Sequence, residues 1–264
     1  MKVRVTAGLF APILILASAL NASHAAPIIF IGDVAGVLGT VDVDTGDVTV
    51  IGDMGVVMTD IAFDPNGNLF GIDFDNLYAI NSTTAEIALI GPTFSGISLS
   101  LNSLVFSSAG TLYAANTSLH TLDPLTGAST LVGNGGDAYD SSGDLAFING
   151  GLYLSSTTLS ADDLFLLDES TGAGTRIGSL GACCFFGLAT DNNIDLFGVA
   201  GPQVFSVDVN TGAAALLLNY AGHGLTFANG SAFISEAVIP IPAAAWLFCS
   251  GLLLFMPWVK RKAM

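Results

Sequence analysis

Short apolar runs separated by turn residues cover most of this chain, and their order repeats. Between residues 59 and 91 the runs are DIAF, NLFGI, NLYAI and EIALIG, each bounded by Gly, Pro, Asn, Asp or Ser/Thr. Comparable sets of four occupy about residues 54–92, 93–133, 134–178 and 179–218. Four short strands recurring about every 40 residues are typical of β-propeller blades. We therefore predict an all-β propeller.

A turn motif marks the same place in each repeat. The motif is an apolar residue, then Asp or Asn, two variable residues, and Thr-Gly or a diverged form of Thr-Gly. The Asp or Asn positions are Asp42, Asn81, Asp123, Asp168 and Asp208. Such side chains accept hydrogen bonds from the next backbone N–H groups, and Gly supplies a positive φ. The motif predicts a tight hairpin between two antiparallel strands of each blade.

The two ends of the repeat region are each incomplete. The first piece has three predicted strands, IIFIGDV, VLGTVDV and DVTVIG, and lacks an innermost strand. The last piece, HGLTFANG and SAFISEA, can supply that strand, and one further predicted strand is then left without a place in a blade. We predict that both ends share a blade, which closes a ring of five four-stranded blades. Six blades, one of them degenerate, are an alternative. A β-sandwich is another, although its strands need not recur with one pattern.

The amino terminus indicates export, and the charge of the predicted propeller limits its partners. Residues 1–25 have a basic start, an apolar middle and a small-residue end at Ser23-His24-Ala25, as in a secretory signal peptide. Residues 26–237, the predicted propeller domain, contain 22 acidic residues and one basic residue, Arg176, a net charge of −21. This charge disfavours nucleic acid as a partner.

Residues 238–264 form a distinct carboxy-terminal segment. A Pro-Ile-Pro element precedes an uncharged run from Ala243 to Val259, whose 17 residues are at the short end of what spans a bilayer. Pro257 lies close to the end of that run. The basic tail stops transfer and holds the chain end in the cytoplasm; its residues are Lys260, Arg261 and Lys262.

This tripartite segment resembles a PEP-CTERM sorting signal. The resemblance lies in the residues Pro240, Ile241, Pro242, Ala243, Ala244, Ala245 and Trp246, followed by the apolar run and the basic tail. Ile241 stands where the family name has Glu, and Cys249 where a small residue is expected. The resemblance implies an exosortase-type transpeptidase as partner. It also implies a membrane anchor before processing, then display at the cell surface or in the extracellular matrix, beside exopolysaccharide or other surface proteins.

Most candidate chemical groups have a structural interpretation. Asp64-Pro65-Asn66-Gly67-Asn68 resembles a calcium loop, but its glycine stands at the fourth place and no Glu follows at the required spacing, which favours a turn. We assign Asp162-Asp163, Asp168-Glu169 and Asp191–Asp195 to solvated turns. His120 replaces the aromatic residue of its strand, which favours packing over catalysis.

The adjacent cysteines Cys183 and Cys184 are the most unusual pair. Neighbouring Cα atoms lie about 3.8 Å apart, below the usual range for a disulfide. The sequence GACCFFGLAT places them at the opening of an inner strand. We predict two buried thiols, with a vicinal disulfide or a metal site as alternatives.

No catalytic motif with a nucleophile elbow, a zinc-binding H-E-x-x-H or a phosphate loop is present. The sequence therefore predicts a non-enzymatic exported propeller with a binding or structural role and no catalytic residue, cofactor or metal. Residues 28–237 resemble secreted propellers of the NHL and lactonase-like kind. The alternative is thus a metal-dependent lactonase- or lyase-like propeller enzyme. Converging Asp, Glu, Asn or His in the channel would favour that enzyme.

Overall fold

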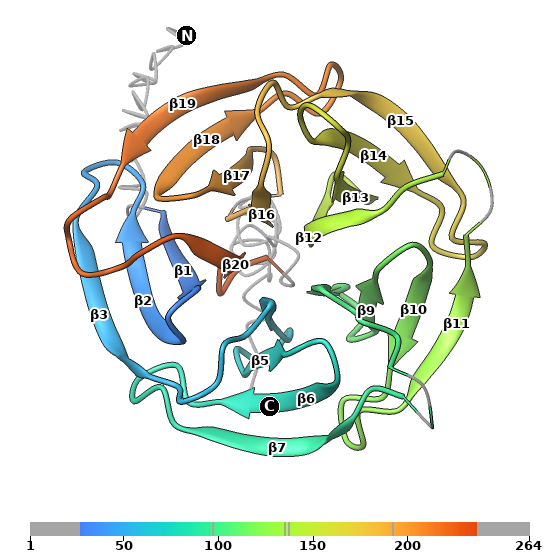
Figure 1. Cartoon of the computed structure of the whole chain (residues 1–264), viewed down its shortest axis with the longest axis horizontal. Helices are drawn as coiled ribbons and strands as arrows, with labels where there is room; N and C mark the ends of the chain where they lie inside the picture. The colour runs from blue at the N-terminus through green and yellow to red at the C-terminus, as the bar shows by residue number, and fades with distance from the viewer. Residues whose placement is uncertain are drawn as a thin grey trace, which may run out of the picture.

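The computed structural model describes residues 27–236 except 95, 97, 135, 137 and 192. Within these residues, twenty strands form five four-stranded antiparallel sheets. Figure 1 shows the sheets arranged as a ring around one axis. Across the described residues, no helix has the length and apolarity needed to cross a membrane. The predicted signal peptide and carboxy-terminal sorting segment lie outside the described residues.

Each blade runs from an inner strand at the axis to an outer strand at the rim. Blade 1 contains β20 (Ala228–Ala232), β1 (Ile28–Asp33), β2 (Val37–Asp42) and β3 (Val48–Asp53). Blade 2 contains β4 (Asp60–Phe63), β5 (Leu69–Ile72), β6 (Asn76–Ile80) and β7 (Ile87–Pro92). Blade 3 contains β8 (Ser103–Phe106), β9 (Leu112–Ala115), β10 (Leu119–Leu122) and β11 (Ser129–Gly133). Blade 4 contains β12 (Ser141–Ile148), β13 (Gly151–Ser156), β14 (Asp163–Leu167) and β15 (Gly174–Ser179). Blade 5 contains β16 (Phe185–Ala189), β17 (Leu196–Ala200), β18 (Gln203–Val207) and β19 (Ala214–Asn219).

The shared blade confirms the predicted ring closure and its five blades. β20 pairs antiparallel with β1, with Phe30 opposite Ala232 and Gly32 opposite Gly230. The predicted boundary was wrong, because HGLTF is a loop and β20 begins only at Ala228. That loop is fixed by Asp33, whose Oδ2 accepts hydrogen bonds from the N–H of Thr226 at 2.9 Å and its hydroxyl at 2.7 Å. The leftover strand therefore does not form.

The repeated hairpin is confirmed, and it also joins neighbouring blades. Asp168 Oδ1 accepts hydrogen bonds from the N–H groups of Ser170 and Thr171 at 2.9 and 3.0 Å, and Gly172 has a φ of +68°. A Cβ on Gly133, in the outer strand of the preceding blade, would lie 2.2 Å from the Thr171 carbonyl oxygen. Glycine in the outer strand thus lets the next blade's turn approach closely.

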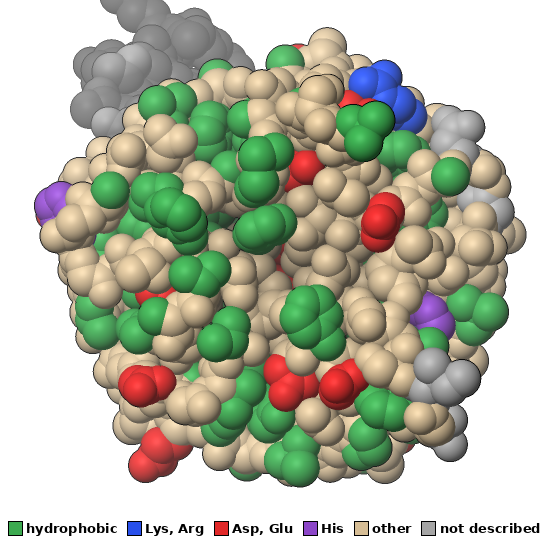
Figure 2. Space-filling model, in the orientation of Figure 1, with side chains coloured by type: hydrophobic (Ala, Val, Ile, Leu, Met, Phe, Trp, Pro, Cys, Tyr) green, Lys and Arg blue, Asp and Glu red, His purple; other side chains and the backbone are tan. Residues whose placement is uncertain are grey.

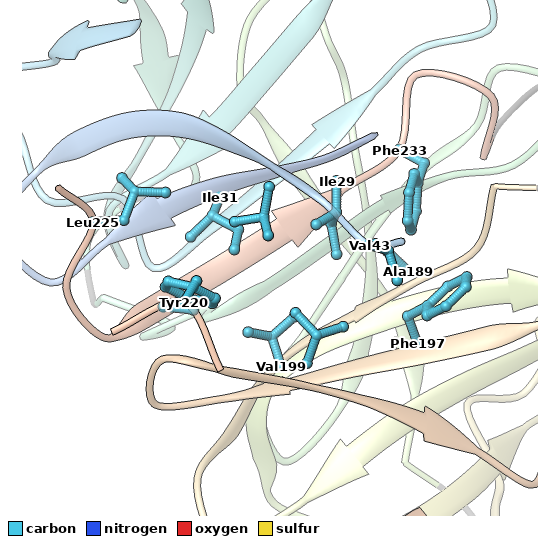
Figure 3. Close-up of a cluster of buried hydrophobic side chains, with 12 residues drawn as sticks. Ile29, Ile31, Val43, Ala189, Phe197, Val199, Tyr220, Leu225 and Phe233 are labelled. Carbon is cyan, nitrogen blue, oxygen red and sulfur yellow. The ribbon is translucent and has the colours of Figure 1, made fainter. Parts of the chain in front are cut away.

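Apolar side chains fill the interfaces between adjacent blades. Figure 3 shows one such cluster, in which Ile29 and Ile31 of β1 lie near Phe197 and Val199 of β17, with Tyr220 beside them. Other buried clusters similarly join neighbouring blades. Because each sheet buries both faces, the ring forms a rigid support for the loops that enter the inner strands.

Candidate functional site

The five inner strands present equivalent residues to the axis. Their aligned tetrapeptides are DIAF, SLVF, DLAF, GLAT and GSAF, and the first residues are Asp60, Ser103, Asp144, Gly187 and Gly230. Two blades thus contribute carboxylates, while the other three contribute small residues. A Cβ on Gly230 would lie 2.5 Å from the Cα and Oδ1 of Asp60. The small residues therefore make room for the two carboxyl groups.

Both axial carboxylates bridge their own strand to the next blade. Asp60 accepts a hydrogen bond from the N–H of its following residue at 2.8 Å and from that of Leu104 at 2.6 Å. Asp144 accepts from the N–H of its following residue and from that of Leu188, both at 2.6 Å. Both aspartates have an exposed fraction of 0%. They join blade 2 to blade 3 and blade 4 to blade 5.

The two axial carboxyl groups interact with each other. Asp60 and Asp144 are hydrogen-bonded to each other, and burial raises the pKa of both carboxyl groups. The negative charge of Asp144 raises the pKa of Asp60 further. The single basic residue between 27 and 236, Arg176, instead forms an ion pair with Asp163 in blade 4. Because no Lys or Arg of the described chain neutralises the pair, we infer that the two carboxyl groups share one proton.

A pocket of about 410 Å³ lies at the end of the ring where the inner strands begin. Each blade contributes to its wall the residue that directly precedes the axial position. These five residues are Thr59, Asn102, Gly143, Phe186 and Asn229. Val56, Val57, Asp73, Phe74 and Ser142 complete the wall. We call this cavity the axial pocket. Figure 2 shows apolar side chains near the centre of this face and acidic ones farther out.

A serine on the pocket wall is backed by a buried carboxylate. Ser142 Oγ donates a hydrogen bond to Asp162 Oδ2 at 2.5 Å, and the N–H of Phe185 donates to the same oxygen at 2.7 Å. Asp162 is 1% exposed, and burial raises its pKa. A carboxylate with a raised pKa is a stronger base than an ordinary aspartate. The pair has the elements of a nucleophile and its general base.

Asn102 supplies an unused polar atom on the same wall. Its Nδ2 donates a hydrogen bond to the Ser141 carbonyl oxygen at 2.9 Å. Its Oδ1 is buried and has no hydrogen-bond partner among the described residues. A buried acceptor without a partner destabilises the folded protein, because it has lost its hydrogen bonds to water.

Several predicted residues are confirmed in their structural roles. Asp64 Oδ1 accepts hydrogen bonds from the N–H groups of Asn66 and Asn68, both at 2.8 Å, so the oxygen-rich segment is a turn. His120 is buried in β10, and burial lowers its pKa. Asp168 lies in an exposed turn, as predicted.

Two predictions about polar groups were wrong. Asp162 and Asp163 are buried instead of solvated, because Asp162 anchors the loop before β16 and Asp163 forms paired hydrogen bonds with Arg176 at 2.6 and 2.8 Å. Cys183 and Cys184 are exposed, free thiols instead of buried ones. The inner strand begins only at Phe185, which leaves both cysteines in the loop.

The axial pair and the Ser142–Asp162 pair were both missed from the sequence. A signal for the first was available, because the pattern Asp-x-Ala-Phe occurs in two inner strands where the others have Ser or Gly at the first position. The second had no local signal, since Ser142 and Asp162 are 20 residues apart and meet only through folding. The sites proposed in the carboxy-terminal segment lie outside the described residues.

The donor set does not fit a catalytic metal. Among residues 27–236, apart from the five undescribed positions, no group of three or more His, Cys, Asp and Glu could hold a metal ion. The oxygens of Asp60 and Asp144 are already used by backbone N–H groups and by each other. Asp73, on the pocket wall, accepts hydrogen bonds from the Tyr78 hydroxyl and two backbone N–H groups. The carboxylates at and near the axis are therefore engaged in hydrogen bonds instead of forming a metal site.

Comparisons with known proteins reveal a shared fold. No family model and no curated protein matches the chain. A candidate gluconolactonase of known structure has a TM-score of 0.50 at 15% identity, with 78% of this chain and 81% of that chain covered. A gluconolactonase from Xanthomonas campestris has a TM-score of 0.49 at 18% identity, with 75% and 77% covered. The hydrazine synthase of Kuenenia stuttgartiensis has a TM-score of 0.44 at 12% identity; the match covers 61% of this chain and only 49% of that one.

These findings correct the prediction that the protein is not an enzyme. The finding against it is the candidate gluconolactonase with a TM-score of 0.50, which shares this propeller fold, although at 15% identity the likeness establishes the fold alone. The lining of the channel points the same way, because aspartates and asparagines converge at the axis and at its mouth. The chemistry available to this protein therefore depends on the residues of its own axial pocket.

Proposed function

We propose that the axial pocket binds a small hydroxylated lactone and hydrolyses its cyclic ester. The observation that supports this most is the Ser142 hydroxyl, which lies on the pocket wall 2.5 Å from the buried Asp162 carboxylate. The fold is shared with a candidate gluconolactonase, which supports the choice of a lactone over other esters. The pocket, at about 410 Å³, is in the range for a small-molecule site.

The proposed reaction uses one nucleophile and one base. Ser142 Oγ attacks the lactone carbonyl carbon while its proton passes to Asp162. The ring C–O bond then breaks, and Asp162 returns the proton to the leaving oxygen, which gives an acyl-enzyme that carries a free hydroxyl. Water attacks this ester, again with Asp162 as base, and releases the hydroxy acid and the free serine. Asp162 is held for this role by the N–H of Phe185.

The pocket and the protein's charge define the substrate class. Asn102 and Asn229 place side-chain amides on the pocket wall, and amide groups can form hydrogen bonds with substrate hydroxyls. Phe74 and Phe186 offer apolar faces for a ring. The net charge of −21 over residues 26–237 repels anions, so it disfavours acidic substrates and favours release of the carboxylate product.

Activity assays with matched variants test the proposal. We expect the full chain to hydrolyse an aldonolactone in a pH-stat, and Ser142→Ala and Asp162→Asn each to lower kcat/KM by roughly 100-fold or more. Ser206→Ala, which removes a half-buried hydroxyl on β18, is the control and should retain activity. Full activity in Ser142→Ala, with the control also active, would overturn the assignment of the nucleophile.

The sorting of the protein is a separate proposal that rests on its sequence. We propose that the basic-ended segment 238–264 anchors the chain temporarily and that an exosortase-type enzyme cleaves near Pro242. The propeller then reaches the cell surface or the extracellular matrix. Intact-mass analysis of mature protein from its native host should find chains that end near Pro242. Chains that mainly end at Met264 would contradict it.

A further inference from the structure

The loop before β16 holds two adjacent thiols at the surface. Cys183 and Cys184 are both exposed and both free, and a hydrogen bond joins their side chains. Cys184 has a φ of +70°, a left-handed conformation that residues other than Gly, Asn and Asp adopt at a cost. The surrounding loop therefore holds this dipeptide in an unfavourable conformation with its two sulfur atoms together.

The loop is fixed by hydrogen bonds to the chain beneath it. The N–H of Asp162 donates to the Ala182 carbonyl oxygen at 2.9 Å, and the N–H of Phe186 donates to the Cys184 carbonyl oxygen at 3.0 Å. The N–H of Phe185 binds the Asp162 carboxylate. Contacts on both sides of the dipeptide thus restrain the backbone, so that the two thiols form a preorganised pair.

We propose that Cys183 and Cys184 form a site for one soft, thiophilic cation of the Cu(I) class. Thiolates are the ligands that such ions prefer, and Cu(I) is satisfied by few sulfur donors. The acidic propeller attracts cations to its surface. Binding replaces two thiol protons by one metal ion, so two protons are released to water and no electron is transferred.

The geometry of adjacent cysteines disfavours a disulfide between Cys183 and Cys184. Adjacent Cα atoms lie about 3.8 Å apart, whereas disulfides usually need at least about 4.4 Å. A disulfide formed here would be strained and easily reduced. The hydrogen bond with the Cys183 thiol, and to a lesser extent burial, raises the pKa of Cys184 to about 11, so the Cys184 thiol is a poor nucleophile at neutral pH.

Competition for Cu(I) with a chromophoric chelator tests this site on the full chain. We expect the reduced protein to withdraw one equivalent of Cu(I) from bathocuproine disulfonate, and Cys183→Ser and Cys184→Ser each to abolish that equivalent. Cys249→Ser is the matched control and should bind as the original protein does. Circular dichroism checks that each variant retains the β-sheet spectrum.

Three results would overturn the proposal. The first is Cu(I) binding that survives both single substitutions, and the second is binding that is lost in Cys249→Ser. The third is the absence of reactive thiols at Cys183 and Cys184 in protein purified without reductant, because it would show that the pair forms a disulfide instead. None of these readouts depends on lactone hydrolysis.

Discussion

Aspartate has opposite roles at the axis and at the rim of this propeller. At the rim, Asp123, Asp168 and Asp208 are exposed, and hydrogen bonds from their own turns lower the pKa of each. At the axis, Asp60 and Asp144 are fully buried, and burial raises the pKa of both. The same side chain thus stabilises a local turn in one region and joins two blades in the other.

The difference is one of sequence distance and of solvent. Each rim aspartate binds N–H groups two or three residues ahead, so the turn can form before the ring is closed. Each axial aspartate binds an N–H group 44 residues away, in the next blade. The hydrogen bonds of an axial aspartate therefore contribute to stability only when the blades are assembled. Removal of the carboxyl group leaves buried N–H donors with neither a protein acceptor nor water.

Removal of the axial strand β20 should have the largest effect. A chain that ends after residue 227 lacks the strand that pairs with β1, which opens blade 1 and exposes its edge. We expect loss of the cooperative thermal transition. A chain that ends after residue 236 retains β20 and serves as the control. If the shorter chain melted at the control's temperature, ring closure would not be needed for stability.

Asp144→Ala should have the next largest effect. It leaves the buried N–H groups of Leu145 and Leu188 without their acceptor, which should cost about 3–5 kcal/mol of unfolding free energy. Asp60→Asn should cost less, because its amide group can donate a hydrogen bond to Asp144 in place of the shared proton. Urea unfolding measures both variants. Equal losses in the two variants would argue against a proton shared between the two carboxyl groups.

The pH dependence of stability should distinguish axis from rim. Because the folded axial pair binds a proton more tightly than the unfolded chain, its contribution is complete below the unfolded pKa of about 4 and is lost as pH rises through the folded pKa. We expect unfolding free energy to fall from pH 4 towards pH 7, and less steeply in Asp60→Asn.

Asp208→Asn is the control for this pH series, because it makes the same substitution at an exposed aspartate of the rim. The pKa of Asp208 is lowered in the folded protein, so its contribution is present above the unfolded pKa and is lost as pH falls. This variant should therefore retain the decline between pH 4 and pH 7. Parallel pH profiles for Asp60→Asn and Asp208→Asn would assign the decline to net charge alone.

The smallest effect should come from Asp208→Ala. Its turn loses the acceptor for the N–H of Asn210, at 2.8 Å, but solvent replaces it because the residue is exposed. We expect a melting temperature within about 2 °C of the original protein. A decrease as large as that of Asp144→Ala would show that the turns and the axis contribute alike.

The sequence predicted what repeats locally and missed what is made by assembly. The turn at Asp168 follows from residues within the motif, and the four complete blades follow from their apolar runs. The shared blade was also predictable, although Thr226 and its contact with Asp33 moved the start of β20. The Ser142–Asp162 contact and the exposure of Cys184 depend on loops whose course no local pattern indicates.

Labelling with an electrophilic lactone tests most directly that the axial pocket is catalytic. A slowly hydrolysed β-lactone should acylate Ser142, and peptide mapping by mass spectrometry should place the added mass on that residue. The label should be lost in Asp162→Asn and retained in Ser206→Ala. Lactone hydrolysis without a label on Ser142, or a label confined to another residue, would contradict the account.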